Sequence, residues 1–286
     1  MLKLGILRSP DGHSLSSVMQ TAALKYLNIE GEYKSYGVSP EKLEKEFYKL
    51  KKEGITGLNV TMPHKIKIIQ YLNELTDRAK LIGAVNTIII KNGKSIGDNT
   101  DVIGFWESIP EYIKKEITTK TISILGTGGA AYACAMAFLQ NGVNCLKIYG
   151  RNKKHLIIIQ ENLQSNTDID IAINIDLTSN IDLSNTDILV NTTPVGMYPN
   201  INETPIKIED LRILPKDANV YDSIYNPIQT RLLKESRSLG LKTINGVDML
   251  VRQGAASLNI WLEKEIAPIE IMRESVVEAC RGMPLP

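Results

Sequence analysis

A glycine-rich turn at residues 126–131 has the spacing that holds the phosphates of a dinucleotide. Gly126-x-Gly128-x-x-Ala131 lies between an apolar, β-branched stretch and an alanine-rich one. In a strand–turn–helix, the first glycine permits the tight turn and the second lets the backbone approach a pyrophosphate. The third position must be small so that the helix packs on the strand, and the free N–H groups of the helix N-terminus face the phosphate. The turn therefore predicts a nucleotide-binding unit of the Rossmann type.

The residues after the next predicted strand indicate which dinucleotide would bind. This segment reads Arg151-Asn152-Lys153-Lys154. An NAD site places an acidic residue here to bind the ribose 2′-hydroxyl, whereas an arginine accommodates a 2′-phosphate. The segment holds three cations and no acid, and a guanidinium can grip phosphate through two hydrogen bonds. We therefore expect NADP rather than NAD, although a lysine here could simply begin a solvated helix.

Four polar clusters in the first half of the chain indicate a second site. Each falls where a predicted strand or helix ends, which is where α/β proteins gather ligand-binding side chains. The clusters are His13–Ser16, Asn59–Lys65, Gly83–Thr87 and Gly97–Asp101. Each also has an ordinary structural explanation, such as Ser14 capping a helix or Asp101 beginning one. Together with a dinucleotide turn, they favour a site for a small-molecule substrate.

Alternating strands and helices must position these clusters. In the first part of the chain the pattern predicts strands at 3–8, 32–36, 58–61 and 85–91, and helices at 14–27, 40–52 and 65–72. Later it predicts helices at 103–113, 130–140, 155–164, 229–239, 249–264 and 268–280, and strands at 121–125, 145–149, 170–173, 188–191, 220–222 and 242–244. Asn92-Gly93 predicts a hairpin turn. The first half is thus an α/β sheet with helical crossovers, and the second has the strand count of a doubly wound sheet.

The composition excludes several classes of protein. Of 286 residues, 43% are apolar and 23% charged, which suits a soluble chain with room for two domains. A net charge of +1 gives no electrostatic case for binding nucleic acid or an acidic membrane. The three cysteines and three histidines are scattered, so we expect no metal site and no disulfide scaffold. Separated cysteines and a start unlike a signal peptide favour the cytoplasm.

Eight motifs follow one another along the chain. They are SxS at 14–16, NVTxPxK at 59–65, GAVNT at 83–87, DNTDxxGF at 98–105, GTGGAA at 126–131, NTTPVGM at 191–197, YNPxxT at 225–230 and NGxxMLVxQGAxS at 245–257. In these motifs the chain resembles the shikimate dehydrogenase family over essentially its whole length. The resemblance implies two α/β domains: a substrate domain at 1–102 with 246–286, and a doubly wound Rossmann NADP-binding domain at 103–245.

The resemblance also implies roles for individual residues. Lys65 and Asp101 correspond to the family's catalytic pair. Ser14, Ser16 and Tyr225 would bind the substrate carboxylate, and Thr61, Asn86 and Gln253 the ring hydroxyls. The cofactor-binding residues would be Gly126, Gly128, Gly129, Ala130, Arg151, Thr192, Gly246 and Met249, the last two near the nicotinamide. The implied reaction is the NADP-dependent reduction of 3-dehydroshikimate to shikimate, by a monomer or a homodimer.

Some positions depart from the family pattern. Ser17 stands where the family usually has proline, and Gly150 and Asn152 replace the usual neighbours of Arg151. His155 stands where a second cation is usual. Ser17 loosens the start of the helix but leaves the two serine hydroxyls in place. The departures around Arg151 and at His155 bear on the strength of the NADP preference.

Two alternatives therefore accompany this interpretation. One is a quinate/shikimate dehydrogenase that uses NAD, against which the two serines and Arg151 argue. The other is a nucleotide-binding regulator without catalysis, against which Lys65 and Asp101 argue.

Because Asp101 favours the charged lysine and desolvation opposes it, the pair should titrate together. Which group takes the proton stays open at this point.

Overall fold

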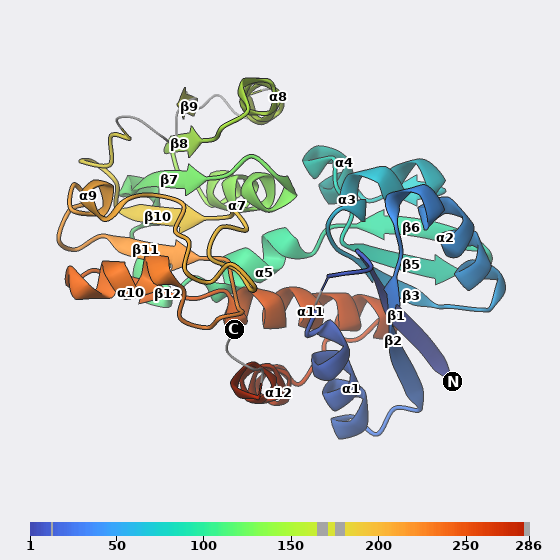
Figure 1. The fold of residues 1–286 in the computed structure, drawn as a ribbon. Coiled ribbons are helices and arrows are strands. Elements are labelled where there is room, and N and C mark those ends of the chain that lie inside the picture. The colour runs from blue at the N-terminus through green and yellow to red at the C-terminus, as the bar shows by residue number, and fades with distance from the viewer. Residues whose placement is uncertain (13, 165–170, 175–180, 283–286) are drawn as a thin grey trace. The chain divides into compact units, whose positions relative to one another are not determined.

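The computed structural model describes residues 1–12, 14–164, 171–174 and 181–282. The chain forms two compact units, one of Met1–Gly104 with Leu250–Gly282, the other of Phe105–Met249 (Figure 1). His13, and residue 170 of the predicted strand 170–173, lie outside the described residues.

The first unit is built on a mixed sheet in the order β2-β1-β3-β5-β6-β4. Its strands are β1 Leu2–Arg8, β2 Gly31–Gly37, β3 Gly57–Val60, β4 Glu74–Leu75, β5 Thr87–Lys91 and β6 Lys94–Asp98. Strand β1 pairs in parallel with β2 and β3, whereas β5 pairs antiparallel with β3 and β6. Asn92 and Gly93 turn the chain between β5 and β6 with φ angles of 51° and 76°, which confirms the predicted hairpin.

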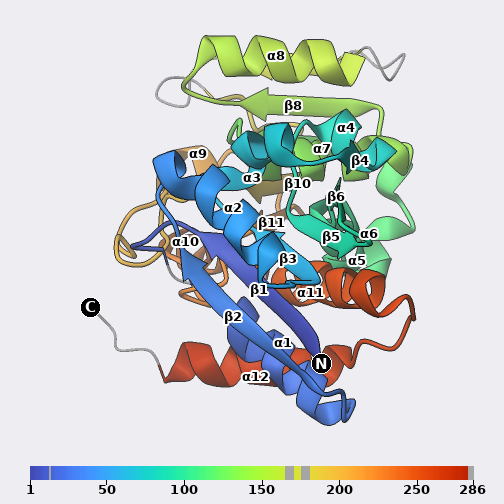
Figure 2. The same ribbon diagram turned by 90° about the vertical axis from the view of Figure 1, so that its right-hand side faces the viewer.

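Short helices cover this sheet. They are α1 Ser16–Tyr26, α2 Leu43–Lys52, α3 His64–Lys67, α4 Asp77–Ile82 and α12 Ile269–Arg281, with 3₁₀ turns at Pro40–Lys42 and Ile68–Tyr71. Leu43, Phe47 and Leu50 recur at helical spacing on α2 and are buried in the core of this unit. Figure 2 shows α1 and α12 side by side, and the two helices are in contact. The C-terminal helix thus packs on one of the first elements of the chain.

The second unit is built on a parallel sheet in the order β12-β11-β10-β7-β8-β9. Its strands are β7 Thr121–Leu125, β8 Cys145–Tyr149, β9 Ile171–Asn174, β10 Ile188–Asn191, β11 Asn219–Asp222 and β12 Lys242–Ile244. The chain order reverses between β7 and β10, which is the switch point where doubly wound sheets bind their ligands. This is the predicted Rossmann arrangement.

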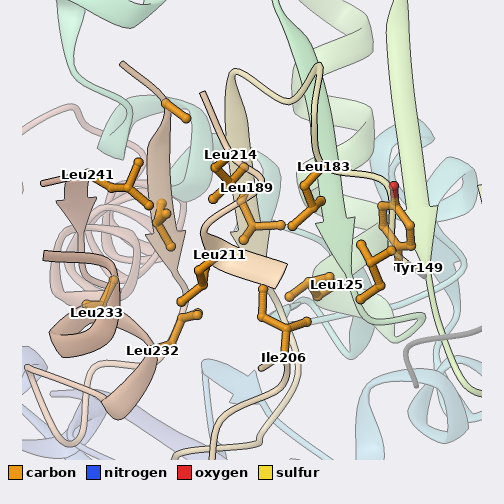
Figure 3. Packing of buried hydrophobic residues seen from close by; sticks show 13 residues of the cluster. Leu125, Tyr149, Leu183, Leu189, Ile206, Leu211, Leu214, Leu232, Leu233 and Leu241 are labelled. Atoms are coloured by element: carbon orange, nitrogen blue, oxygen red, sulfur yellow. The ribbon is translucent and has the colours of Figure 1, made fainter. Parts of the chain in front are cut away.

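The helices of the second unit bury apolar side chains. They are α6 Glu111–Lys114, α7 Gly129–Gln140, α8 Lys153–Gln164, α9 Ile208–Leu211 and α10 Arg231–Ser238, with a 3₁₀ turn at Ile117–Thr119. Leu125, Leu189 and Leu232 form part of the core shown in Figure 3. Two further helices, α5 Asp101–Ser108 and α11 Val247–Leu262, begin in one unit and end in the other.

The predicted helix 103–113 is wrong in its extent. The chain forms α5 to Ser108 and then the separate turn α6 from Glu111. Pro110 stands between them and caps α6. Because proline has no N–H to donate and its ring blocks the preceding turn, the first helix ends before it.

Candidate active site

Lys65 and Asp101 are in contact although 36 positions separate them in the sequence. Lys65 lies on α3, soon after β3, and Asp101 begins α5 soon after β6. The lysine Nζ donates to the carboxylate Oδ2 at 2.5 Å, and the two side chains are 19% and 7% exposed. A partly buried ammonium beside a carboxylate can hold or release a proton as its neighbours change. The pair can therefore take a proton from a hydroxyl group, or return one.

The side-chain amide of Asn86 holds the other oxygen of Asp101. Its Nδ2 donates to Asp101 Oδ1 at 2.8 Å and to Gln253 Oε1 at 3.2 Å, while its Oδ1 accepts from the Thr100 backbone N–H at 2.8 Å. Both carboxylate oxygens therefore have a donor, which fixes the carboxylate plane. The fold thus brings together Lys65, Asn86, Asp101 and Gln253, all of which the sequence analysis singled out.

A buried network of hydroxyl and amide groups adjoins these residues. Asn59 Nδ2 donates to Ser257 Oγ at 3.0 Å, and this oxygen also lies 2.7 Å from Thr87 Oγ1 and 3.1 Å from Thr100 Oγ1. Thr100 Oγ1 in turn receives the Asn86 amide at 2.9 Å. The network ties β3, β5 and the end of β6 to α11. The sequence predicted no individual role for Asn59, Thr87, Thr100 or Ser257, although all four lie in the motifs that carry the family resemblance.

A second buried carboxylate, Asp98, fixes the backbone that enters α5. Arg78 donates to both of its oxygens, from Nε at 3.1 Å and from Nη2 at 2.7 Å. Thr76 Oγ1 and the Asn99 backbone N–H donate to it as well, each at 2.7 Å. A guanidinium that binds a carboxylate through two parallel bonds sets its orientation. Asp98 therefore positions the short segment that leads to Asp101.

The two serines of the first motif lie next to each other. Ser14 Oγ donates to Ser16 Oγ at 3.1 Å and accepts the Ser16 backbone N–H at 3.2 Å. Ser16 also hydrogen-bonds to Tyr33, whose pKa is raised well above its usual value by burial. Thr61 directly follows β3, and its N–H donates to the Leu7 carbonyl of β1 at 3.0 Å. Neighbouring hydroxyls of this kind can donate to the two oxygens of a carboxylate.

The glycine turn lies at the switch point of the second sheet. Gly126 has a φ of 120°, which favours glycine, and its N–H donates to the Tyr149 carbonyl at 2.8 Å. A Cβ on Gly126 would lie 2.4 Å from Thr192 Oγ1, so Thr192 packs directly against the turn. Gly128 caps α7, and a Cβ there would meet no atom within 4 Å. Ala131 is completely buried, as the close packing of helix on strand requires.

These features fit the pyrophosphate and 2′-phosphate of NADP. Gly129 and Ala130 begin α7, so their backbone N–H groups belong to the unsatisfied first turn of a helix that favours phosphate. Arg151 follows the adjacent strand β8 and is exposed. Gly150 beside it lies close to Thr127, because a Cβ on Gly150 would stand 2.2 Å from Thr127 Cγ2. An exposed guanidinium at this strand end is suited to a ribose 2′-phosphate.

The other predicted ligand-binding residues of this unit follow β11 and β12. Tyr225 is half-buried, and Met249 is buried in the first turn of α11. Gly246 N–H donates to the Ile224 carbonyl at 3.0 Å, and a Cβ on Gly246 would lie 2.0 Å from the Ser223 carbonyl oxygen. Tyr225 thus belongs to the second unit, whereas the other predicted substrate-binding residues belong to the first.

Asp222 ends β11 as a completely buried carboxylate. It accepts hydrogen bonds from Thr230 Oγ1 at 2.6 Å, from the Ile224 N–H at 3.1 Å and from Asn191 Nδ2 at 3.0 Å. Burial raises the pKa of Asp222 from 3.8 to about 6, and it outweighs these hydrogen bonds, which lower the pKa.

This pKa predicts a pH-dependent stability. The folded protein holds the Asp222 proton more tightly than the unfolded chain, so its contribution to stability falls as the pH rises from about 4 to about 6, by about 3 kcal/mol. Asp222→Asn does not titrate, so its free energy of unfolding should rise by that amount relative to wild type across the same window. Urea unfolding of both proteins at several pH values measures this difference. A difference that does not change with pH would contradict the prediction.

In the described part of the chain, no three His, Cys, Asp or Glu side chains gather so that they could hold a metal ion. Within the same residues, no helix combines the length and the apolar character that crossing a membrane requires. Cys134, Cys145 and Cys280 are not joined in disulfides.

Comparison with known proteins identifies the family. A family profile described as the shikimate dehydrogenase substrate binding domain matches residues 6–88, and one described as the shikimate 5'-dehydrogenase C-terminal domain matches residues 246–277. The chain is 44% identical over 258 residues to the shikimate dehydrogenase (NADP(+)) of Methanococcus maripaludis, and the match covers 90% of each chain. The chain belongs to the shikimate dehydrogenase family.

Solved structures of shikimate dehydrogenases have the same fold over nearly the whole chain. One that was crystallised in complex with NADP+ is 37% identical, with a TM-score of 0.86 and coverage of 98% of this chain and 96% of that one. The shikimate 5-dehydrogenase of Thermus thermophilus, in complex with NADP(H) and shikimate, is 28% identical, with a TM-score of 0.84 and coverage of 98% and 100%. These comparisons confirm the family resemblance and the α/β fold class predicted from the motifs.

Proposed function

We propose that this protein is an NADP-dependent shikimate dehydrogenase, which reversibly reduces 3-dehydroshikimate to shikimate. The observation that carries the proposal is the contact between Lys65 Nζ and Asp101 Oδ2 at 2.5 Å, with Asn86 on the other carboxylate oxygen. Interconverting an alcohol and a ketone requires a group that takes or gives the hydroxyl proton. The names of the relatives support both the substrate and the cofactor.

The chain's own residues would handle the proton. In the direction of shikimate oxidation, the hydroxyl proton passes to the Lys65–Asp101 pair as hydride leaves the carbon that bears this hydroxyl. NADP, when bound, accepts that hydride. Asp101 stabilises the protonated Nζ, and Asn86 keeps the carboxylate facing the lysine. In the reverse direction, Nζ returns the proton to the developing alkoxide, so one pair serves both directions.

Hydroxyl and amide groups would bind the rest of the substrate. We assign Ser14, Ser16 and Tyr225 to the carboxylate, because hydroxyl donors bind it with geometric selectivity. We assign Thr61, Asn86 and Gln253 to the ring hydroxyls. The hydrogen bond from Asn86 Nδ2 to Gln253 Oε1 at 3.2 Å supports a shared subsite for two of them.

The cofactor-binding residues would all lie in the second unit. We assign the pyrophosphate to the turn Gly126–Ala130, the 2′-phosphate to Arg151 and the nicotinamide side to Thr192, Gly246 and Met249. We also propose a substrate domain of residues 1–102 with 246–286 and an NADP-binding domain of residues 103–245. By these bounds Gly246 and Met249 begin the second segment of the substrate domain. We further propose a cytoplasmic monomer or homodimer that acts on small molecules, without nucleic acid or membrane as a partner.

The test is the appearance of reduced-nicotinamide absorbance with shikimate and NADP, run beside NAD and beside quinate. We expect a fast rate with NADP and shikimate and little rate in the other combinations. Comparable rates with NAD or quinate would make the protein a dual-specificity quinate/shikimate dehydrogenase. Folded protein that binds nucleotide but shows no rate in any combination would overturn the proposal.

Arg151→Gln tests the choice of cofactor. Loss of a charge-assisted bond to the 2′-phosphate should raise the KM for NADP by about tenfold and leave the KM for NAD unchanged. Lys153→Gln, two residues further along and also exposed, is the matched control and should have a smaller effect. Steady-state kinetics with both cofactors measures the ratio. Equal effects of the two substitutions would remove the special role of Arg151.

A further inference from the structure

The three loops at the carboxyl ends of β10, β11 and β12 each carry a residue that we assigned to a ligand. Thr192 follows β10, Tyr225 lies three residues beyond β11, and Gly246 lies two residues beyond β12. None of these loops is a helix or strand, so hydrogen bonds outside the sheet ladder must hold them in place. The question is which group does so.

Asp222 joins the first two loops. Its Oδ1 accepts from Asn191 Nδ2 at 3.0 Å and from the Ile224 N–H at 3.1 Å. Asn191 Oδ1 then accepts from Thr193, from the backbone N–H at 3.0 Å and from Oγ1 at 2.7 Å. One carboxylate thus reaches both Thr193, next to Thr192, and Ile224, next to Tyr225.

The same connection extends to the third loop. The Ile224 carbonyl accepts the Gly246 N–H at 3.0 Å. Ile224 therefore links the two residues, because its own N–H donates to Asp222. On its other oxygen, Asp222 accepts from Thr230 Oγ1 at 2.6 Å, and Thr230 caps α10. The network therefore has one centre, and that centre is completely buried.

The chemistry of the network explains why a carboxylate stands there. Three donors converge on it, and an ionised carboxylate offers two oxygens that only accept. Its partners are neutral groups: a hydroxyl, a backbone amide and a side-chain amide. Removing the carboxylate would leave buried donors without acceptors, and their loops would move to find others.

We propose that Asp222 is a positioning residue that holds the loops carrying Thr192 and Gly246, both assigned to the nicotinamide side, and so sets the affinity for the nicotinamide half of NADP. The same network holds the loop of Tyr225, which we assigned to the substrate carboxylate. The identity of the nucleotide rests on the proposed function. Asp222 would act through these loops and not by touching the cofactor. The adenosine 2′-phosphate, assigned to Arg151, would be independent of it.

Comparing the affinities of two nucleotides distinguishes the nicotinamide half from the adenosine half. NADPH contains both, whereas adenosine 2′,5′-bisphosphate lacks the nicotinamide half. Isothermal titration calorimetry with Asp222→Ala should show NADPH binding weakened by about tenfold or more, since hydrogen bonds to a charged group are lost. Binding of adenosine 2′,5′-bisphosphate should stay within about twofold of wild type. Asp222→Asn keeps an acceptor on one side and should recover most of the NADPH affinity.

Asn219→Ala is the matched control. Asn219 is a buried polar residue at the opposite end of the same strand, where it accepts a hydrogen bond from Tyr112 at 2.7 Å. This variant should bind both nucleotides as wild type does. If Asp222→Ala does not fold, Asn191→Ala decides instead, because it removes the link to Thr193 and leaves Asp222 two of its donors.

The outcomes distinguish this inference from the proposed function. NADPH binding that is unchanged in the deciding variant, or weakened equally with adenosine 2′,5′-bisphosphate, would overturn the inference. Wild-type protein that binds NADPH but does not oxidise shikimate would overturn the proposed function alone, and the comparison of the two nucleotides would still decide the role of Asp222. Wild-type protein that does not bind NADPH would overturn both.

Discussion

Lys65→Ala is expected to lower kcat for shikimate oxidation by about 10²–10⁴-fold, which is what proton transfer by a positioned side chain contributes. The lysine Nζ donates to Asp101 Oδ2 at 2.5 Å. Asp101→Asn keeps the size of the side chain but removes the charge that stabilises the protonated lysine, so a loss of similar order is expected. Since the two act as a unit, the double variant should be little worse than either single one. Turnover at saturating shikimate and NADP measures these effects.

A control on the same helix separates proton transfer from folding. Lys67 also lies on α3, but its Nζ donates to the Pro40 carbonyl at 2.8 Å on an exposed surface. Lys67→Ala should keep wild-type turnover. The urea midpoint of Lys65→Ala should fall, because Asp101 loses a partner and keeps the Asn86 donor, but the variant should remain folded without urea. If Lys65→Ala and Asp101→Asn both turned over at near wild-type rates, this pair would not be the proton carrier.

Gly128→Ala should leave the protein as stable as wild type and yet weaken NADPH binding by about tenfold to a hundredfold. At Gly128 the φ is −89°, which alanine adopts easily, and a Cβ meets no protein atom within 4 Å. The added methyl group would therefore cost nothing in the protein itself. It would instead stand where the backbone must approach the pyrophosphate. Calorimetric titration with NADPH and urea unfolding measure the two quantities.

The neighbouring glycine provides the contrasting variant. Gly126 has a φ of 120°, and a Cβ there would lie 2.4 Å from Thr192 Oγ1. Gly126→Ala should therefore destabilise the fold as well as the nucleotide complex, since both backbone and packing are strained. If Gly128→Ala bound NADPH as wild type does, the pyrophosphate would have to lie elsewhere on this unit.

Some elements of the fold could be predicted closely because local signals marked both of their ends. Strands β7, β8, β10 and β12 have the predicted bounds. The first three are short apolar or β-branched runs flanked by polar or glycine residues. The glycine turn could be placed from its spacing alone. The grouping of Lys65 with Asp101 followed instead from the family resemblance, because no local pattern joins residues so far apart.

Other elements were missed or misplaced. Helix α4 was not predicted, although Thr76 caps its start by accepting the Ala79 N–H and Gly83 ends it with a φ of 66°. The predicted strand 85–91 begins only at Thr87, because the Val85 N–H donates to the Lys65 carbonyl at 2.8 Å instead of joining the ladder. Tertiary contacts of this kind override the β-branched pattern.

The buried polar partners could not be derived from the sequence either. Ser257 meets Asn59 and Thr87 only because α11 packs against strands that precede it by more than 150 residues. Composition and periodicity describe neighbours along the chain and say nothing about such pairs. The motifs marked these positions as unusual, but their donor and acceptor roles require the folded geometry.

The division of the first unit between two distant segments of chain has a consequence for biosynthesis. Gln20 Nε2 donates to the Gly254 carbonyl at 2.8 Å, and Trp261 Nε1 donates to the Ile88 carbonyl at 3.0 Å. Gly254 and Trp261 follow the second unit, Phe105–Met249, in the sequence, so that unit is synthesised in full before either of them leaves the ribosome. Because domains generally fold as units during synthesis, the nucleotide-binding unit can fold before Met1–Gly104 gains the segment Leu250–Gly282 that completes its unit. Lys65 and Asp101, which would handle the proton, thus emerge early. Helix α11, whose Gln253 accepts a hydrogen bond from Asn86 beside them, emerges late.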